Sequence, residues 1–243
     1  MNLVAALAAE SSLLCVVGAG GKKSTLYALA SRIDRAVVTA TVRIPIFDDH
    51  VADVVVTGAP ADALESAEEW PLGLVPERER PDRYRGYEPE TVASVADSNT
   101  NANSIFVKAD GARTRLLKAP NEREPQLPAN ANVVVPIASA RVVGKPLTEE
   151  FVHRPERVAE ITDRQVGELI HASDVAGVLA SERGGLKDVP DDVTAIPVVN
   201  MVDDDQREET GREIAEMVLA EADVPRVVLT QMTAQKPVVA VVE

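Results

Sequence analysis

The feature that most constrains this chain is a glycine-rich turn between an apolar run and a helix-like segment near the N-terminus. Leu13 to Val17 is a short apolar run typical of a buried strand, and Lys22 to Ile33 has apolar residues at helical spacing. The turn reads Gly18-Ala19-Gly20-Gly21-Lys22-Lys23-Ser24-Thr25. In a strand, glycine turn and helix of this kind, backbone N–H groups and a lysine can bind phosphate. The sequence therefore predicts a phosphate-binding loop, with a glycine turn that binds no ligand as the alternative.

Strand-like and helix-like segments alternate along the rest of the chain. Strands are expected at 36–42, 54–56, 105–110, 133–135, 175–179, 196–200, 227–229 and 238–242, and helices at 61–69 and 207–220. This alternation predicts βαβ units, a mostly parallel sheet and a three-layer α/β/α sandwich like that of P-loop NTPases. We expect one nucleotide-binding domain over residues 1–243, with an irregular excursion near 70–90, where proline and glycine accumulate.

Charge and cysteine content exclude several classes of protein. The formal net charge is −14, which argues against a nucleic-acid partner because such binding needs a basic surface. No apolar stretch approaches the length of a membrane span, and the single cysteine excludes an internal disulfide. We expect a cytoplasmic protein without membrane contact. Dispersed acidic residues and scarce lysine favour a salt-adapted (halophilic) source, with an ordinary acidic protein as the alternative.

The loop matches no standard nucleotide-binding template. In the P-loop pattern G-x-x-x-x-G-K-[ST], Gly21-Lys22 supplies the G-K pair, but Lys23 replaces the hydroxyl residue and valine replaces the first glycine. The dinucleotide pattern G-x-G-x-x-G fails because its last position is Lys23. Two consecutive lysines favour a polyphosphate. Lys22 or Lys23 would reach the β- and γ-phosphates, and Ser24 or Thr25 would help to hold Mg²⁺.

A second group of polar residues follows the expected strand at 105–110. Asp110 ends this strand, and in P-loop proteins such an acid holds Mg²⁺ directly or through water. A capping or turn aspartate is the alternative. Arg113, Arg115 and Lys118 form a basic cluster that could bind a phosphate or an anionic substrate. A solvated charged face is the simpler interpretation of these three residues.

Two weaker patterns lie further along the chain. Asn200-Met201-Val202-Asp203 is similar to the N-K-x-D element of GTPases, in which the aspartate reads guanine and the asparagine supports the loop. The alternative is a polar loop whose aspartates cap the next helix. His153, beside Arg154, is either a substrate contact or an ordinary surface histidine.

Several segments together resemble one family. The glycine loop, Asp110-Gly111-Ala112-Arg113, Lys118-Ala119-Pro120 and Glu124-Pro125-Gln126-Leu127-Pro128 are similar to segments of the YqeC-type selenium-dependent (molybdenum) hydroxylase accessory proteins. The resemblance implies a P-loop-type nucleotide-binding protein that takes part in maturing molybdenum hydroxylases, with such a hydroxylase or its cofactor-maturation proteins as partners. The family usually has Thr or Ser where this chain has Lys23, which shifts the expected Mg²⁺ ligand to Ser24. It often has an acid where this chain has Lys108.

We therefore expect a Mg²⁺-dependent protein that binds or hydrolyses ATP or GTP. Residues 18–25 would bind the nucleotide with Asn200 and Asp203, Ser24 and Asp110 would hold the metal, and Lys22, Asp110 and Arg113 would act in catalysis. One alternative is a phosphotransferase acting on a small anionic metabolite. Another is a non-catalytic nucleotide- or partner-binding module whose P-loop has degenerated.

Overall fold

A single large sheet forms the centre of the computed structural model, which describes residues 1–98 and 100–243. Its strand order is β14-β13-β12-β9-β1-β7-β2-β5-β4, with β11 beside β9. Pairing is parallel except between β13 and β14. In chain order these ten strands are β1 (Leu13–Gly18), β2 (Ala36–Ala40), β4 (Asp53–Val56), β5 (Leu72–Val75), β7 (Ser104–Lys108), β9 (Val133–Ser139), β11 (Thr194–Ala195), β12 (Val198–Asn200), β13 (Val227–Thr230) and β14 (Val238–Val242).

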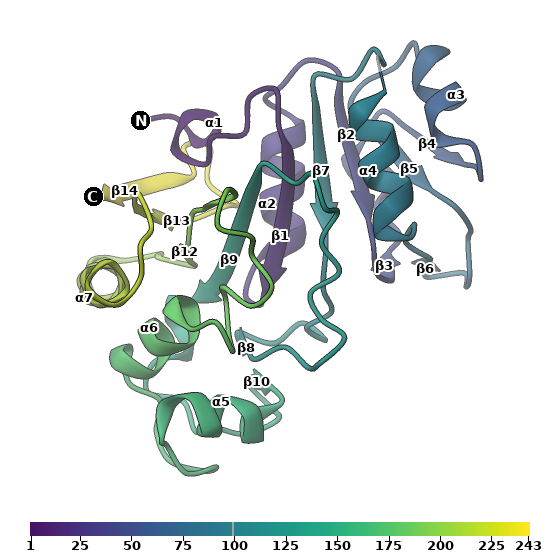
Figure 1. Cartoon of the computed structure of the whole chain (residues 1–243). Coiled ribbons are helices and arrows are strands. Elements are labelled where there is room, and N and C mark those ends of the chain that lie inside the picture. The colour runs from purple at the N-terminus through teal and green to yellow at the C-terminus, as the bar shows by residue number, and fades with distance from the viewer. Residues whose placement is uncertain (99) are drawn as a thin grey trace.

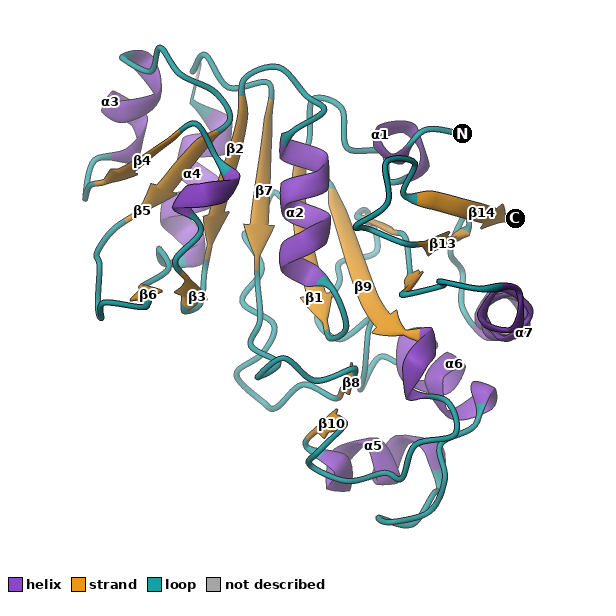
Figure 2. Cartoon of the chain, turned by 180° about the vertical axis from the view of Figure 1, so that it is seen from behind, coloured by secondary structure: helices purple, strands orange, loops and turns teal. Residues whose placement is uncertain are grey.

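Helices cover both faces of this sheet, which confirms the predicted three-layer α/β architecture (Figures 1 and 2). Apolar residues of α1 and α2 pack on one face, and those of α3, α4, α6 and α7 pack on the other. None of the described helices has the length and apolar composition needed to cross a membrane. The helices are α1 (Leu3–Ala6), α2 (Lys22–Ala30), α3 (Pro60–Glu65), α4 (Pro89–Asp97), α5 (Pro155–Thr162), α6 (Ala172–Ala180) and α7 (Asp205–Glu221), with short 3₁₀ turns at η1 (Asp48–His50) and η2 (Ala140–Val142).

The central strands are apolar on both faces because helices cover both. In β1, Val16 packs in the layer that contains α2, and its neighbour Val17 packs in the layer that contains α4. Such continuous apolar runs are expected for parallel strands buried on both sides. Leu26 and Leu29, three residues apart on one face of α2, are buried, and α2 packs against β1 and β7.

The carboxyl ends of β1, β7, β9 and β12 meet at one edge of the sheet, where the glycine loop lies. Two short ladders add to this edge: β8 (Leu117–Lys118) with β10 (Val152–His153), and β3 (Ile44–Pro45) with β6 (Arg83–Tyr84). Figure 1 shows β8, β10 and α5 beyond the ends of the central strands. Open parallel sheets bind ligands at this edge, so the fold places the predicted site where such a site is expected.

The expected strand at 175–179 is wrong, because these residues lie in α6. The helix begins at the N-cap His171, and Asp174 Oδ2 accepts a hydrogen bond from the His171 N–H at 2.7 Å. A short apolar run does not distinguish a strand from a buried helix by periodicity alone. The capping box of His171 and Asp174 indicates a helix start, which the apolar run alone does not.

Residues 70–90 are only partly irregular. They contain β6 and also β5, which pairs with both β2 and β4 in the main sheet. Helix α4 was also not predicted. Pro71, Gly73 and Pro76 are turn-forming residues in or beside β5, and they obscured a strand of four residues. Other expected elements differ from the structure mainly at their ends: α2 ends at Ala30 rather than Ile33, and β7 ends at Lys108, two residues before Asp110.

Gly73→Ala tests the packing of β5. A Cβ atom at this buried position would lie 2.6 Å from Phe47 Cε2 and 3.0 Å from Val54 Cγ2. Overpacking of this kind costs about 1–3 kcal/mol, so we expect a lower midpoint in urea. Gly58→Ala is the matched control, because its Cβ meets nothing within 4 Å. Equal midpoints for the two variants would contradict this packing.

Candidate phosphate-binding site

Three glycines shape the loop because side chains do not fit there. Gly18, Gly20 and Gly21 have φ values of +87°, +84° and +144°. An added Cβ would lie 2.3 Å from Ile137 O at Gly18, 2.9 Å from Leu116 O at Gly20, and 2.0 Å from Asn200 Nδ2 at Gly21. Both the backbone conformation and the close approach of neighbouring chain segments therefore require glycine.

The loop presents free backbone donors at the start of α2. Ala19 N–H donates to Ile137 O at 2.8 Å, and Gly20 N–H donates to Arg115 O at 2.9 Å. The first helical bond runs from Thr25 N–H to Gly21 O. Within residues 1–98 and 100–243, the N–H groups of Lys22 to Ser24 have no acceptor. Free donors at a helix N-terminus, together with the helix dipole, form an anion-binding arrangement.

Lys22 is buried within this arrangement and faces Asp110. Its Nζ lies 2.8 Å from Asp110 Oδ1 and also donates to Gly18 O. Burial lowers the pKa of Lys22 below its usual value, while the nearby Asp110 carboxylate opposes that change. Burial would raise the pKa of Asp110, but the ammonium groups of Lys22 and Lys118 outweigh it, so that pKa lies below its usual value. The structure thus brings together two of the predicted site residues, Lys22 and Asp110.

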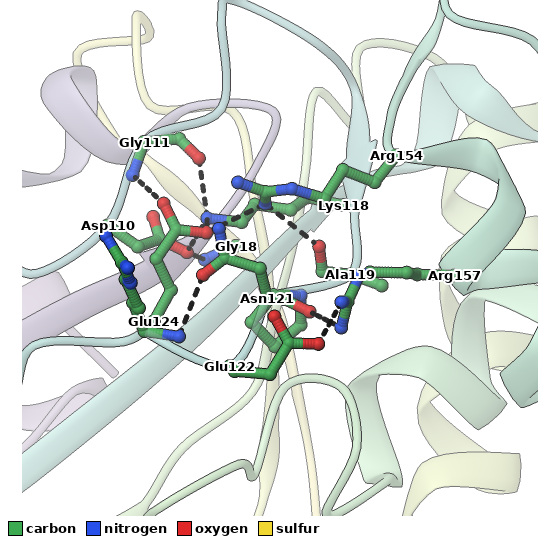
Figure 3. A network of polar contacts seen from close by, with 12 residues as sticks. Gly18, Asp110, Gly111, Lys118, Ala119, Asn121, Glu122, Glu124, Arg154 and Arg157 are labelled. Atoms are coloured by element: carbon green, nitrogen blue, oxygen red, sulfur yellow. Dashed lines mark hydrogen bonds and ion pairs between the residues drawn. The ribbon is translucent and has the colours of Figure 1, made fainter.

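Lys118 lies between two carboxylates, as Figure 3 shows. Its fully buried Nζ is 2.7 Å from Asp110 Oδ2 and 2.9 Å from Glu124 Oε2, and it donates to Gly111 O at 2.5 Å. An ammonium group has three donors, so these three acceptors satisfy it. Burial would raise the pKa of Glu124, but Lys118 and, to a lesser degree, Arg154 hold it below its usual value. Lys118 therefore acts as an internal counterion for Asp110 and Glu124.

A second layer of contacts fixes residues 119–124 against the start of α5. Arg154 Nη1 lies 2.7 Å from Glu124 Oε2 and 3.3 Å from Ala119 O. Arg157 pairs with Glu122 and donates to Pro120 O at 3.2 Å (Figure 3). The carboxylate of Glu124 thus links Lys118 in the interior to Arg154 nearer the surface.

Asn200 holds the glycine loop through a side-chain hydrogen bond. At the end of β12 its amide donates to Gly20 O at 2.8 Å, and its carbonyl oxygen accepts from the Thr230 hydroxyl at 3.1 Å. Asp203, the predicted base-reading residue, accepts from Arg141 Nε at 2.6 Å through Oδ2. The structure therefore places Asn200 in contact with the loop and Asp203 in an ion pair with Arg141.

The other residues singled out in the sequence are not members of the Lys22–Asp110 ion pair. The Thr25 hydroxyl is buried and donates to Gly21 O at 3.1 Å, whereas Lys23 and Ser24 are half-buried in the first turn of α2. Arg113 is exposed. Lys108 is buried on β7 and donates to Arg43 O at 2.7 Å; burial, together with the charges of Lys22 and Lys118, lowers its pKa to about 7.

The sequence did not reveal the roles of Lys118 and Glu124. The sequence pattern groups Lys118 with Arg113 and Arg115 as an anion-binding residue, whereas its three donors are all satisfied within the protein. The only signal was the pair of segments Lys118-Ala119-Pro120 and Glu124-Pro125, which carry the family resemblance. Asp110, Lys118 and Glu124 lie in a segment without helical or strand periodicity, so the sequence gives no sign that the chain brings their side chains together.

Comparison with known proteins identifies relatives of the region that holds this site. The family model for the YqeC protein matches residues 14–156, more than half of the chain. A protein of Escherichia coli (strain K12), described as "Uncharacterized protein YqeC", is 27% identical over 195 residues, which cover 78% of this chain and 75% of the relative. No solved structure matches. The matched model spans the glycine loop, Asp110, Lys118, Glu124 and Arg154.

Lys118→Met tests the internal counterion. The variant leaves the buried Asp110 and the half-buried Glu124 short of positive charge, and removing one partner of a buried ion pair costs about 3–5 kcal/mol. We expect a loss of that size in the free energy of unfolding at pH 7, measured in urea. The exposed Lys236→Met should change it by less than about 0.5 kcal/mol. Similar midpoints for both variants would show that Lys118 does not stabilise the fold.

The loss of stability in Lys118→Met should depend on pH. The pKa values of Asp110 and Glu124 are below their usual ones, so their stabilising contribution is present above about pH 4 and is lost as the pH falls through the lower folded values. Protonated carboxyl groups are neutral and do not need Lys118. The difference in stability between wild type and Lys118→Met should therefore shrink in acid; a difference independent of pH from 7 to 3 would contradict this.

Proposed function

The chain belongs to the YqeC protein family, and we propose that it binds a nucleoside triphosphate, ATP or GTP, through residues 18–25. One observation carries the proposal: the N–H groups of Lys22 to Ser24 are free at the start of α2, beside the buried ammonium group of Lys22. Phosphate oxygens accept hydrogen bonds from such donors, and the lysine balances their charge. The three consecutive donors suit the oxygen-rich end of a polyphosphate.

In this proposal Asp110 keeps Lys22 charged and oriented until the phosphate binds. A buried lysine tends to lose its proton, and the carboxylate at 2.8 Å favours the charged form. Lys22 has three donors and two protein partners, Gly18 O and Asp110, which leaves one donor for a phosphate oxygen. Lys118 lets Asp110 remain ionised with or without a ligand.

The residues present do not by themselves form a Mg²⁺ site. Both oxygens of Asp110 already face ammonium groups, and Ser24 lies on the half-buried first turn of α2. Among the described residues, no group of three or more His, Cys, Asp or Glu side chains could hold a metal ion. Mg²⁺ is often carried by substrate phosphates and retains several waters. We therefore propose that Mg²⁺, when it takes part, enters with the nucleotide.

The wider role follows from the family resemblance alone. Binding, or binding followed by hydrolysis, would serve the maturation of a molybdenum- or selenium-dependent hydroxylase. Nucleotide binding without turnover would favour the non-catalytic module. Turnover that appears only with an added small anion would favour the phosphotransferase.

Lys22→Met tests the binding proposal. Loss of a charge-assisted contact of about 1.5–3 kcal/mol corresponds to roughly a 10- to 150-fold weaker affinity. We expect this loss in calorimetric titrations with ATP and GTP, each with Mg²⁺ and with EDTA, and a smaller loss for Lys23→Met. The exposed Lys236→Met is the control, and circular dichroism checks that each variant is folded. Absence of binding at millimolar nucleotide, or equal affinities for wild type and Lys22→Met, would contradict the proposal.

Asn200→Ala separates loop support from base reading. The Asn200 amide contacts Gly20 O, so its loss should weaken ATP and GTP by the same factor, several-fold. Asp203→Asn should weaken GTP alone if Asp203 reads guanine. A selective loss of GTP affinity in Asn200→Ala would show that Asn200 contacts the base instead of the loop.

A further inference from the structure

A small polar cavity lies beside the glycine loop, where β10 meets α5. Its volume is about 130 Å³, and a drug-sized site is several times larger. The residues that line it include three arginines, a histidine and two acids: Arg113, Arg115, His153, Arg154, Glu149 and Glu156. Three arginines thus line one small cavity in a chain of net charge −14.

Two of the arginines are held by protein contacts. Arg115 Nε donates to Glu149 O at 2.5 Å, and its Nη1 donates to Arg113 O at 3.4 Å. Arg154 uses Nη1 for Glu124 and Ala119 O. A guanidinium has five donors, so both side chains keep donors beyond these contacts. Arg113 is exposed, and no side-chain partner is found for it in the described part of the chain. The cavity therefore has prepositioned donors and the cation of Arg113, with Glu149 and Glu156 as the acids on its wall.

The backbone is strained where it presents these arginines. Arg113, Thr114 and Arg154 have φ values of +47°, +60° and +64°, a conformation that costs residues other than glycine roughly 1 kcal/mol or more. Such strain is retained where the surrounding structure requires it, and it is common at ligand sites. Two separate chain segments bear this strain on the walls of the same cavity.

His153 lies on the cavity wall as a neutral side chain. It is half-buried on β10, and its register partner on β8 is Lys118. Burial, followed by the charges of Arg154 and Lys118, lowers its pKa to about 4. At pH 7 the imidazole therefore adds one donor and one acceptor without charge.

The cavity is joined to the glycine loop by hydrogen bonds. Gly20 N–H donates to Arg115 O at 2.9 Å, and Ser139 N–H donates to Leu116 O at 3.0 Å. The segment that carries Arg113 and Arg115 thus packs directly against the loop. A ligand in the cavity would therefore lie on the side of the glycine loop where Gly20 contacts Arg115.

We infer that this cavity binds a second, small anionic ligand that carries a carboxylate or a phosphate group. Arg113 is its main charged contact, and Arg115, Arg154 and His153 orient it through hydrogen bonds. Anion binding here does not depend on the nucleotide. The further step, that this anion is the partner substrate of a nucleotide on residues 18–25, rests on the proposed function.

The test uses malonate and inorganic phosphate as probes and the histidine NMR signals as the readout. The chain has three histidines, His50, His153 and His171. Addition of malonate should move the His153 signal in a saturable manner and raise its titration midpoint, because a bound anion favours the imidazolium. The His50 and His171 signals should follow only the ionic strength, which sodium chloride at equal ionic strength reproduces. Saturation by phosphate but not malonate would identify a phosphate ligand.

Matched arginine variants separate the cavity from the loop. Arg113→Gln should weaken malonate binding at least fivefold. Arg123→Gln, on an exposed side chain, should leave the malonate affinity unchanged. A His153 signal that moves no more with malonate than with chloride would overturn the inference, as would malonate binding that is lost in Lys22→Met but kept in Arg113→Gln. Malonate binding without any ATP binding would support the anion site in the cavity and contradict the proposed nucleotide function.

Discussion

The contact on which the site depends is the one between Asp110 and two buried ammonium groups. Lys22 and Lys118 lie 2.8 and 2.7 Å from its two oxygens, and all three side chains are nearly inaccessible to solvent. A buried charge is costly unless a counterion and hydrogen bonds satisfy it. Each member of this group therefore requires the others. The group joins Lys22 in α2 and Lys118 in β8 to Asp110, which follows β7 at the carboxyl edge of the sheet.

This arrangement explains why the loop can hold a lysine in the interior at all. Gly18, Gly20 and Gly21 let the chain turn closely around Ile137, Ser139 and Asn200, and the helix that follows starts with free donors. Glu124 forms ion pairs with both Lys118 and Arg154, and Arg154 lines the polar cavity between β10 and α5. The phosphate loop and the cavity are thus parts of one connected polar region, although each is proposed to bind a different group.

Local features of the sequence predicted more than its long-range contacts. The glycine loop could be predicted because its conformational requirement is local, and Asp110 because it follows a buried strand. The pairing of Lys118 with Asp110 and Glu124 depends on the path of residues 109–124. Hydrophobic periodicity does not predict the path of such an irregular segment. The apolar run of α6 fits a strand as well as a buried helix, and Pro71 and Gly73 beside and within β5 are typical of turns, so periodicity alone does not identify these two elements.

The most direct measurement of phosphate binding is a crystal structure with a non-hydrolysable analogue of ATP or GTP. Binding through residues 18–25 predicts phosphate oxygens about 3 Å from the N–H groups of Lys22 to Ser24 and from Lys22 Nζ, with Asp110 still paired to Lys118. An analogue bound elsewhere, or bound here with its phosphates directed away from the start of α2, would contradict it.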